Sequence, residues 1–229
     1  MNILKAIRSL NKFEICLWSV SVTIILVSFF ISHGSDYLSL AASLIGATSL
    51  IFLARGFAFG QILMIIFSTI YGVISFRFHY YGEMLTYVGM TLPMAVVSLI
   101  SWIKHPYQKT AEVEVSRLNT KKIVFLILSS VAVTVVFYFI LKRFNTANLI
   151  PSTFSVLTSY IAAALTAFRS PYYAIGYATN DIVLIILWAL ATATDITYLP
   201  MTVCFATFFV NDMYGFLCWK RMENRQKKQ

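Results

Sequence analysis

Eight runs of apolar residues follow one another along the chain, and each is about as long as a membrane-spanning helix. They cover residues 15–32, 37–54, 57–77, 84–103, 122–141, 151–168, 171–193 and 197–219. About 20 apolar residues in a helix cross the ~30 Å hydrocarbon layer of a bilayer. The short alternating strands typical of a membrane β-barrel are missing from the pattern. The sequence therefore predicts an all-α integral membrane protein with eight transmembrane helices.

Most segments between the runs are short, so we expect a single membrane domain over residues 1–229 without a separate soluble domain. The one long connector, residues 104–121, has mixed charge and is expected to be a solvated surface segment. Residues 220–229 are expected to form a basic cytoplasmic tail. Pro93 lies in the middle of an apolar run and predicts a kink there.

The basic residues are unevenly divided between the two sides that eight spans would define. Fifteen of the 18 Lys and Arg residues fall on the side of the N-terminus, and only Arg77, Lys142 and Arg143 fall on the other side. Cytoplasmic loops carry the excess of Lys and Arg in membrane proteins. We therefore expect both termini to be cytoplasmic in a multi-pass protein of the cytoplasmic membrane.

An internal repeat relates the two halves of the chain. The segment LARGFAFGQILMIIFSTIYGVI at 53–74 lines up with FRSPYYAIGYATNDIVLIILWALA at 168–191, which matches Arg55 with Arg169. Trp102 and Trp219 end the corresponding third spans. The pattern predicts a 3+1+3 arrangement: three-helix repeats at 37–103 and 151–219, linked by a helix at 122–141 and preceded by an extra N-terminal helix at 15–32. Parallel repeats with a substrate site at their interface are a transporter design.

Composition and charge agree with this picture and narrow the functions. Hydrophobic residues make up 59% of the chain and charged residues 12%, against about 25% charged in soluble domains. The net charge of +9 resides in the tails and loops, so we expect a lipid bilayer and not a nucleic acid as the partner. The three cysteines lack metal-ligand spacing and a disulfide pattern. No metal and no cofactor is predicted.

Two aspartates lie inside the long apolar runs, and each follows an asparagine. Asn180-Asp181 lies in the seventh run and Asn211-Asp212 in the eighth. A carboxylate in the middle of a membrane costs at least ~2.5–3.5 kcal/mol. At ~1.5 Å per residue, Asp181 lies about 16 Å and Asp212 about 10 Å from the cytoplasmic end, so the two can meet. We expect these residues to face a polar cavity, although intramembrane Asn and Asp can also join helices by hydrogen bonds alone.

Helical spacing adds further candidates to this cavity. Trp188 is seven residues from Asp181 and shares its face, which favours a stacking platform for a substrate ring. Residues at steps of three and four on the other spans place four more side chains toward the same cavity: Gln61, Tyr71, Tyr87 and Tyr214. Trp102 and Trp219, by contrast, are expected to be interfacial belt residues at the cytoplasmic boundary.

An enzyme is a distant alternative. Two membrane-embedded aspartates are also found in intramembrane aspartyl proteases, where paired carboxylates share a proton. The Gly-x-Gly-Asp sequence of those proteases is absent, and no hydrolase or phosphate-binding motif is found. We expect no enzymatic activity. A helper subunit of a larger complex is the other alternative.

The run SPYYAIGYATNDIVLIILW at 170–188, followed by FFVNDMYGFLCWKRM at 208–222, resembles the PnuC-type nicotinamide riboside transporters of bacteria. The resemblance extends over residues 37–222, and it implies a fold like that of the SWEET sugar transporters. It places the family's substrate-binding Asn and Trp of the seventh helix on Asn180 and Trp188, the Asn of the eighth on Asn211, and the Gln of the third on Gln61.

The resemblance implies facilitated uptake of nicotinamide riboside, with the substrate trapped by a cytosolic riboside kinase. The candidate residues suit such a ligand, because aromatic faces and a carboxylate attract its pyridinium cation. Asn and Gln can bind its carboxamide and its ribose. Thiamine, also a cation, would suit the same residues, and a neutral deoxynucleoside or riboflavin would suit them less well, so the exact substrate stays open within the vitamins and nucleosides. A homo-oligomer is equally compatible with the sequence.

Overall fold

The computed structural model describes residues 10–32, 36–77, 80–146 and 148–228. Within these residues, eight helical spans are long and apolar enough to cross a membrane. They are α2 (Lys12–Ile31), α3 (Tyr37–Ala54), α4 (Ala58–Arg77), the fourth span made of α5 (Tyr81–Thr86), η1 (Tyr87–Thr91) and α6 (Leu92–Lys104), then α7 (Thr120–Arg143), α8 (Leu149–Ala167), α9 (Tyr173–Thr194) and α10 (Leu199–Lys227). The predicted all-α fold with eight spans is confirmed.

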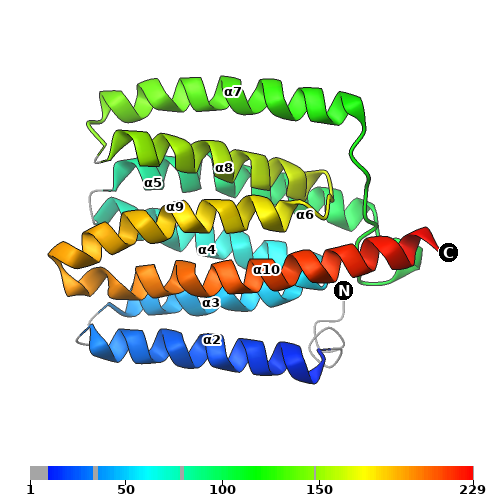
Figure 1. Ribbon diagram of the computed structural model, residues 1–229, viewed down its shortest axis with the longest axis horizontal. Coiled ribbons are helices and arrows are strands. Elements are labelled where there is room, and N and C mark those ends of the chain that lie inside the picture. The colour runs from blue at the N-terminus through cyan, green and yellow to red at the C-terminus, as the bar shows by residue number, and fades with distance from the viewer. Residues whose placement is uncertain (1–9, 33–35, 78–79, 147, 229) are drawn as a thin grey trace.

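Six of these spans form a closed ring in which each helix packs against the next. The order around the ring is α3, α4, α6, α8, α9 and α10, and α10 packs back on α3. The third helix of each half therefore packs against the first helix of the other half. Helices α2 and α7 lie outside the ring, at opposite edges of the bundle (Figure 1). The ring encloses the side chains that form the candidate site.

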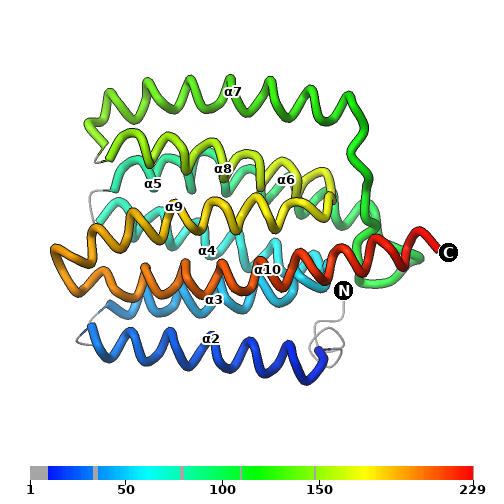
Figure 2. Tube along the Cα trace, in the orientation of Figure 1, coloured from blue at the N-terminus to red at the C-terminus, as the bar shows by residue number. Residues whose placement is uncertain are grey.

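Successive spans alternate in direction, so the start of α2 and the end of α10 lie at the same end of the bundle. The turn between α3 and α4, the connector before α7 and the turn between α8 and α9 lie at that end too (Figure 2). We call this end the termini end and the opposite one the far end. The expected basic residues Lys5 and Arg8 lie outside the described residues.

The two repeats end their first helices in the same way. A left-handed residue follows each helix: Gly56, with φ of +68°, after α3 and Arg169, with φ of +58°, after α8. The amide of the next residue donates back to the helix at both sites, from Phe57 to Phe52 O and from Ser170 to Leu165 O, each at 3.0 Å. These are matching C-caps. They pair Arg169 with Gly56, and not with Arg55 as the sequence alignment did.

Trp102 and Trp219 connect the two repeats and do not form an interfacial belt. Their side chains are 2% and 0% exposed, and their rings lie 5.3 Å apart. The Trp102 Nε1 group donates to Thr166 O at the end of α8 at 2.9 Å, and the Trp219 Nε1 group donates to Leu53 O at the end of α3 at 2.8 Å. The belt prediction was wrong because both rings find a carbonyl acceptor inside the protein.

Four spans begin earlier than predicted, and in two of them, α2 and the fourth span, the shift brings a carboxylate into the bundle. α2 begins at Lys12, because Asn11 and Glu14 form a reciprocal capping box with hydrogen bonds of 2.7 and 2.8 Å. The fourth span begins at Tyr81, so Glu83 lies within a helix and is buried. The sequence pattern had placed both acidic residues just outside their spans.

The fourth span contains a π-helical segment, Tyr87–Thr91, which ends two residues before Pro93. Proline has no N–H and cannot donate to the preceding turn. The wider turn before it allows the chain to continue as α6. Single π turns within α-helices occur frequently at functional sites, and Tyr87 begins this one.

The C-terminal residues continue α10 beyond the bundle instead of forming a separate tail. α10 extends to Lys227, and its last turns contact the connector before α7. Gln226 bonds Glu112 at 2.8 Å and accepts from the Val115 amide at 2.8 Å, and Arg225 pairs with Glu112. The connector is thereby fixed against the termini end of the ring.

Candidate functional site

An aromatic cluster fills the interior of the ring. Its rings come from both repeats, and every member is buried: Phe67 and Tyr71 of α4, Tyr87 of η1, Trp188 of α9, and Phe205 and Phe208 of α10. Tyr71 lies at its centre, with ring centroids 4.2 Å from Tyr87, 5.5 Å from Phe205 and 5.6 Å from Phe67. Side chains far apart in the sequence thus form one surface of aromatic faces.

Trp188 is held in this cluster by a hydrogen bond across the two repeats. Its Nε1 group donates to the Tyr71 hydroxyl at 2.8 Å, and its side chain is 1% exposed. Toward the far end the ring contacts Tyr80 and Tyr198, at centroid distances of 4.9 and 5.9 Å. The sequence predicted a platform on Trp188. The structure adds the two tyrosines that cover it.

Asp181 and Asp212 meet inside the ring. Both are buried, and their carboxyl groups lie close enough to interact directly. One Asp181 oxygen, Oδ2, has no hydrogen-bond partner within the described residues. The ion pairs found in the described chain involve neither aspartate. The prediction that α9 and α10 bring the two carboxyl groups together thus agrees with the structure.

Asn180 points from α9 toward α8. Its Oδ1 atom accepts hydrogen bonds from Ser155 Oγ at 3.1 Å and from Thr158 Oγ1 at 2.9 Å. Two hydroxyl groups fix the orientation of this amide and leave its two N–H donors available to other groups. Asn180 is therefore oriented by a neighbouring helix before any ligand is present.

Asn211 and Tyr214 face α2, outside the ring. The Asn211 Nδ2 group donates to Ser21 Oγ of α2 at 3.1 Å and to Thr207 O at 2.8 Å. The Tyr214 hydroxyl donates to Glu14 Oε1 at 3.1 Å. Because adjacent residues of a helix point about 100° apart, Asp212 can face Asp181 while Asn211 faces α2. The Asn211 Oδ1 atom is buried without a partner in the described structure.

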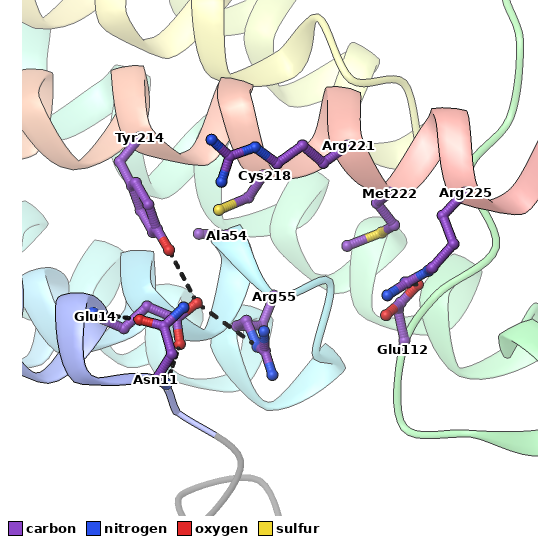
Figure 3. Close-up of a pocket in the computed structure, with 10 residues that line it drawn as sticks. All are labelled: Asn11, Glu14, Ala54, Arg55, Glu112, Tyr214, Cys218, Arg221, Met222 and Arg225. Carbon is purple, nitrogen blue, oxygen red and sulfur yellow. Dashed lines mark hydrogen bonds and ion pairs between the residues drawn. The ribbon is translucent and has the colours of Figure 1, made fainter.

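Tyr214 lines a cavity of about 250 Å³ at the termini end of the bundle. Figure 3 shows Glu14 at one side of this cavity, where it interacts with Tyr214 and Arg55, and the pair of Glu112 and Arg225 at the other. The Arg55 Nε to Glu14 Oε1 distance is 3.7 Å. The structure thus separates Tyr214 from the aromatic cluster, with which the sequence analysis had grouped it.

Two further buried polar side chains lie in the first repeat. Gln61, near the start of α4, is buried, and its Nε2 group has no hydrogen-bond partner within the described residues. Glu83 of α5 is the residue that the sequence analysis missed. The sequence signal for Glu83 is that it directly precedes an apolar run, but an acidic residue in that position is equally typical of a solvated loop. In the described part of the chain, no group of three or more His, Cys, Asp or Glu side chains could hold a metal ion.

Comparisons with known proteins agree on one family. The family model for the nicotinamide mononucleotide transporter matches residues 36–221. The nicotinamide riboside transporter PnuC of Neisseria mucosa is 24% identical over 205 residues, which are 87% of this chain and 78% of that protein. The crystal structure of the vitamin B3 transporter PnuC superposes with a TM-score of 0.83 at 24% identity and covers 95% of this chain and 94% of that one. That similarity confirms the fold.

Proposed function

Because the chain belongs to the nicotinamide mononucleotide transporter family, we propose that it carries nicotinamide riboside by facilitated diffusion across the bacterial cytoplasmic membrane. The substrate is taken from the name of the Neisseria mucosa relative. Both matched proteins are transporters, as is the family, so the chain is a transporter and not an enzyme. The embedded-hydrolase alternative is therefore set aside.

The proposed substrate site lies at the interface of the two repeats, beside the aromatic cluster. The observation that carries this proposal is the hydrogen bond from Trp188 of the second repeat to Tyr71 of the first. A substrate that stacks on this pair would contact both halves at once, and relative movement of the halves would change its access to either side of the membrane. Tyr87 would contribute a third ring.

Polar side chains beside the cluster suit the rest of the molecule. Asn180 is preoriented by α8, and the Gln61 Nε2 donor has no partner within the described residues. Amides offer donors and acceptors that match a carboxamide and the hydroxyl groups of ribose. Asp181 and Asp212 would provide negative charge. We leave Asn211 and Tyr214 out of the proposed site because both side chains bond α2, outside the ring.

The cationic ring of the substrate fits this environment. An aromatic face attracts a desolvated cation by ~2 kcal/mol or more. Thiamine is the second candidate substrate, since its thiazolium is also a cation. We propose that a cytosolic riboside kinase traps the transported substrate by phosphorylation, because facilitated diffusion alone cannot accumulate it.

Uptake into proteoliposomes tests the proposal. Purified protein is reconstituted, and entry of labelled nicotinamide riboside is compared with entry of labelled thiamine and with protein-free vesicles. We expect saturable uptake of nicotinamide riboside that stops at equal concentrations inside and outside. Uptake of thiamine alone would identify thiamine as the substrate in place of nicotinamide riboside. Uptake of neither compound would refute the proposal. A rate that changes with an imposed pH gradient would show proton coupling in place of simple facilitation.

A further inference from the structure

We propose that Glu83 binds the positive charge of the transported molecule, at the far end of the aromatic cluster. This inference rests on the proposed function and deepens it, because it names one side chain that would recognise the ligand class, an organic cation with a flat aromatic ring. Asp181 and Asp212 are the acidic residues that the sequence pattern indicates, and Glu83 is a third, separate carboxylate on the other repeat.

Glu83 is buried without compensation. It is the third residue of α5, its side chain is 2% exposed, and neither carboxylate oxygen has a hydrogen-bond partner within the described residues. None of the ion pairs of the described chain involves it. Buried polar atoms in proteins are almost always satisfied, and each exception needs an explanation. An uncompensated carboxylate is among the most costly exceptions.

The nearest hydroxyl group is already engaged. Ser155 of α8 lies beside the Glu83 carboxyl group, but its single hydroxyl proton is donated to Asn180 Oδ1 at 3.1 Å. A hydroxyl group has only one proton to donate. While Ser155 donates to Asn180 it cannot also donate to Glu83, and in this arrangement neither Glu83 oxygen has a donor among the described residues.

Three tyrosines of the candidate site lie within electrostatic range of Glu83. Its carboxyl group is close enough to interact electrostatically with Tyr71, Tyr80 and Tyr87. Tyr71 bonds Trp188, and Tyr80 lies 4.9 Å from the Trp188 ring. A carboxylate among aromatic faces is the combination that binds organic cations. A flat cationic ring on Trp188 or Tyr87 would have its charge next to Glu83, and its binding would remove the cost of the buried carboxylate.

Glu83 and the aspartate pair differ in what they offer a cation. Asp181 and Asp212 interact with each other, and two adjacent carboxyl groups satisfy part of each other's requirement by sharing a proton. Glu83 has no such neighbour among the described residues. It is therefore the carboxylate that gains most from a bound cation. Tyr87 lies within range of both Glu83 and Asp181, so one ring borders both acidic positions.

The test compares a cation with its neutral counterpart. Binding of nicotinamide riboside and of its dihydro form, which has nearly the same shape and no ring charge, is measured by calorimetry on the purified full-length protein. For Glu83→Gln we expect about 30-fold weaker binding of the cation, as for the loss of one partner of a buried charge pair, and a change of under about threefold for the neutral compound. Glu83→Asp should give an intermediate loss for the cation only.

Asp195→Asn is the matched control. Asp195 is an exposed carboxylate at the same far end, and the hydrogen bond from the Thr197 amide holds its pKa below its usual range. This variant should leave both affinities unchanged. Melting temperatures of all variants check folding, and Glu83→Asp carries the test if Glu83→Gln does not fold.

Three outcomes separate the inference from the proposed function. A selective loss for the cation supports the role of Glu83. Wild-type protein that binds nicotinamide riboside, together with Glu83→Gln that binds it equally well or loses both compounds equally, overturns this inference alone. Wild-type protein that binds neither cation nor neutral compound overturns the proposed function and the inference with it.

Discussion

Trp188, which we propose to bind the substrate, also has a role in the fold. Tryptophan usually resides at membrane interfaces, where its N–H group meets water. Here the Nε1 group finds the Tyr71 hydroxyl at 2.8 Å, so the indole can stay deep in the bundle without an unsatisfied donor. Tyr80 and Tyr198 cover the ring on the side of the far end. A substrate that stacks on Trp188 must displace or join these two tyrosines.

Substitutions of similar size separate the aromatic face of Trp188 from its bulk. Trp188→Phe keeps an aromatic face, and Trp188→Leu keeps an apolar side chain without one. We expect affinity for nicotinamide riboside to fall by about 30-fold in Trp188→Leu, equivalent to ~2 kcal/mol of cation–π attraction, and much less in Trp188→Phe. Calorimetry measures the two affinities. Equal losses in both variants would assign Trp188 to packing alone.

The two Asn-Asp pairs show how far side-chain roles follow from sequence. Burial of all four side chains and the meeting of Asp181 with Asp212 could be predicted from apolar context and helix depth. The partners of the asparagines could not. Asn180 bonds α8 and Asn211 bonds α2, and the choice depends on which helix lies beside each face. Helical spacing gives the face of a side chain, whereas the neighbour on that face is set by the packing of the whole ring.

At the scale of the helix, the two repeats match most closely at the C-caps of their first helices, where the backbone adopts a left-handed conformation. The C-caps after α3 and α8 use the same hydrogen bonds and the same left-handed residue. Gly56 adopts this conformation without a Cβ penalty, whereas Arg169 adopts it at a cost. Arg169 lies 3.7 Å from Glu114, and partial burial lowers the pKa of its guanidinium from its ordinary value. The residue identities at this equivalent position differ, so sequence alignment chose Arg55.

Opposite substitutions at these two caps should have opposite effects on stability. Gly56→Ala should destabilise the protein by ~1–2 kcal/mol, because an L-residue is strained at positive φ and its Cβ would lie 3.0 Å from Met222 Cε. Arg169→Gly should relieve the same strain and lose only a half-exposed ion pair worth ~0–1 kcal/mol. Melting temperatures in detergent should therefore fall for Gly56→Ala and stay or rise for Arg169→Gly. A fall of equal size in both would contradict the shared cap geometry.

Helix boundaries were predictable to within a few residues, and the exceptions follow from capping and charge. The third run, at 57–77, and α4 (Ala58–Arg77) nearly coincide, because Gly56 ends the preceding turn. The runs that begin after Glu14 and Glu83 were shortened, because an acidic residue at the edge of an apolar run reads as solvated. Glu14 closes a local capping box with Asn11 and also contacts Tyr214 and Arg55, and Glu83 is buried inside the bundle. The burial of both residues depends on tertiary packing, which hydropathy alone cannot reveal.

At the scale of the molecule, the ring shows how the two repeats together enclose the candidate site. Because α10 packs on α3 and α6 packs on α8, each repeat closes the other. The two tryptophans that donate across these contacts lie at the termini end, and the aromatic cluster lies between them and the far end. The tryptophan contacts fix the halves at one end of the bundle. Movement that opens the cluster is therefore expected toward the far end, and it would have to break the cross-repeat hydrogen bond from Trp188 to Tyr71.

The orientation of the ring in the membrane is a prediction from its charges, and labelling can test it. Fifteen of 18 basic residues were assigned to the termini end, so we expect this end to face the cytoplasm. Cys16, Cys204 and Cys218 are replaced by alanine, and single cysteines are introduced at two exposed positions, Gln108 and Asn145. In intact cells, a membrane-impermeant maleimide should label Asn145→Cys only. In inside-out vesicles, it should label Gln108→Cys only.

These two positions are chosen because they flank α7, which tests the span as well as the orientation. α7 has 24 residues, or about 36 Å of helix, enough to cross the hydrocarbon layer. It packs mainly on α8, and Leu141 and Phe137 also reach the fourth span near Met90, so most of its surface is left to face lipid or another subunit. Reversed labelling would show that the orientation in the membrane is opposite to the predicted one, without contradicting the fold. Labelling of both positions from one side would instead remove α7 as a span, and the two repeats could then no longer be parallel.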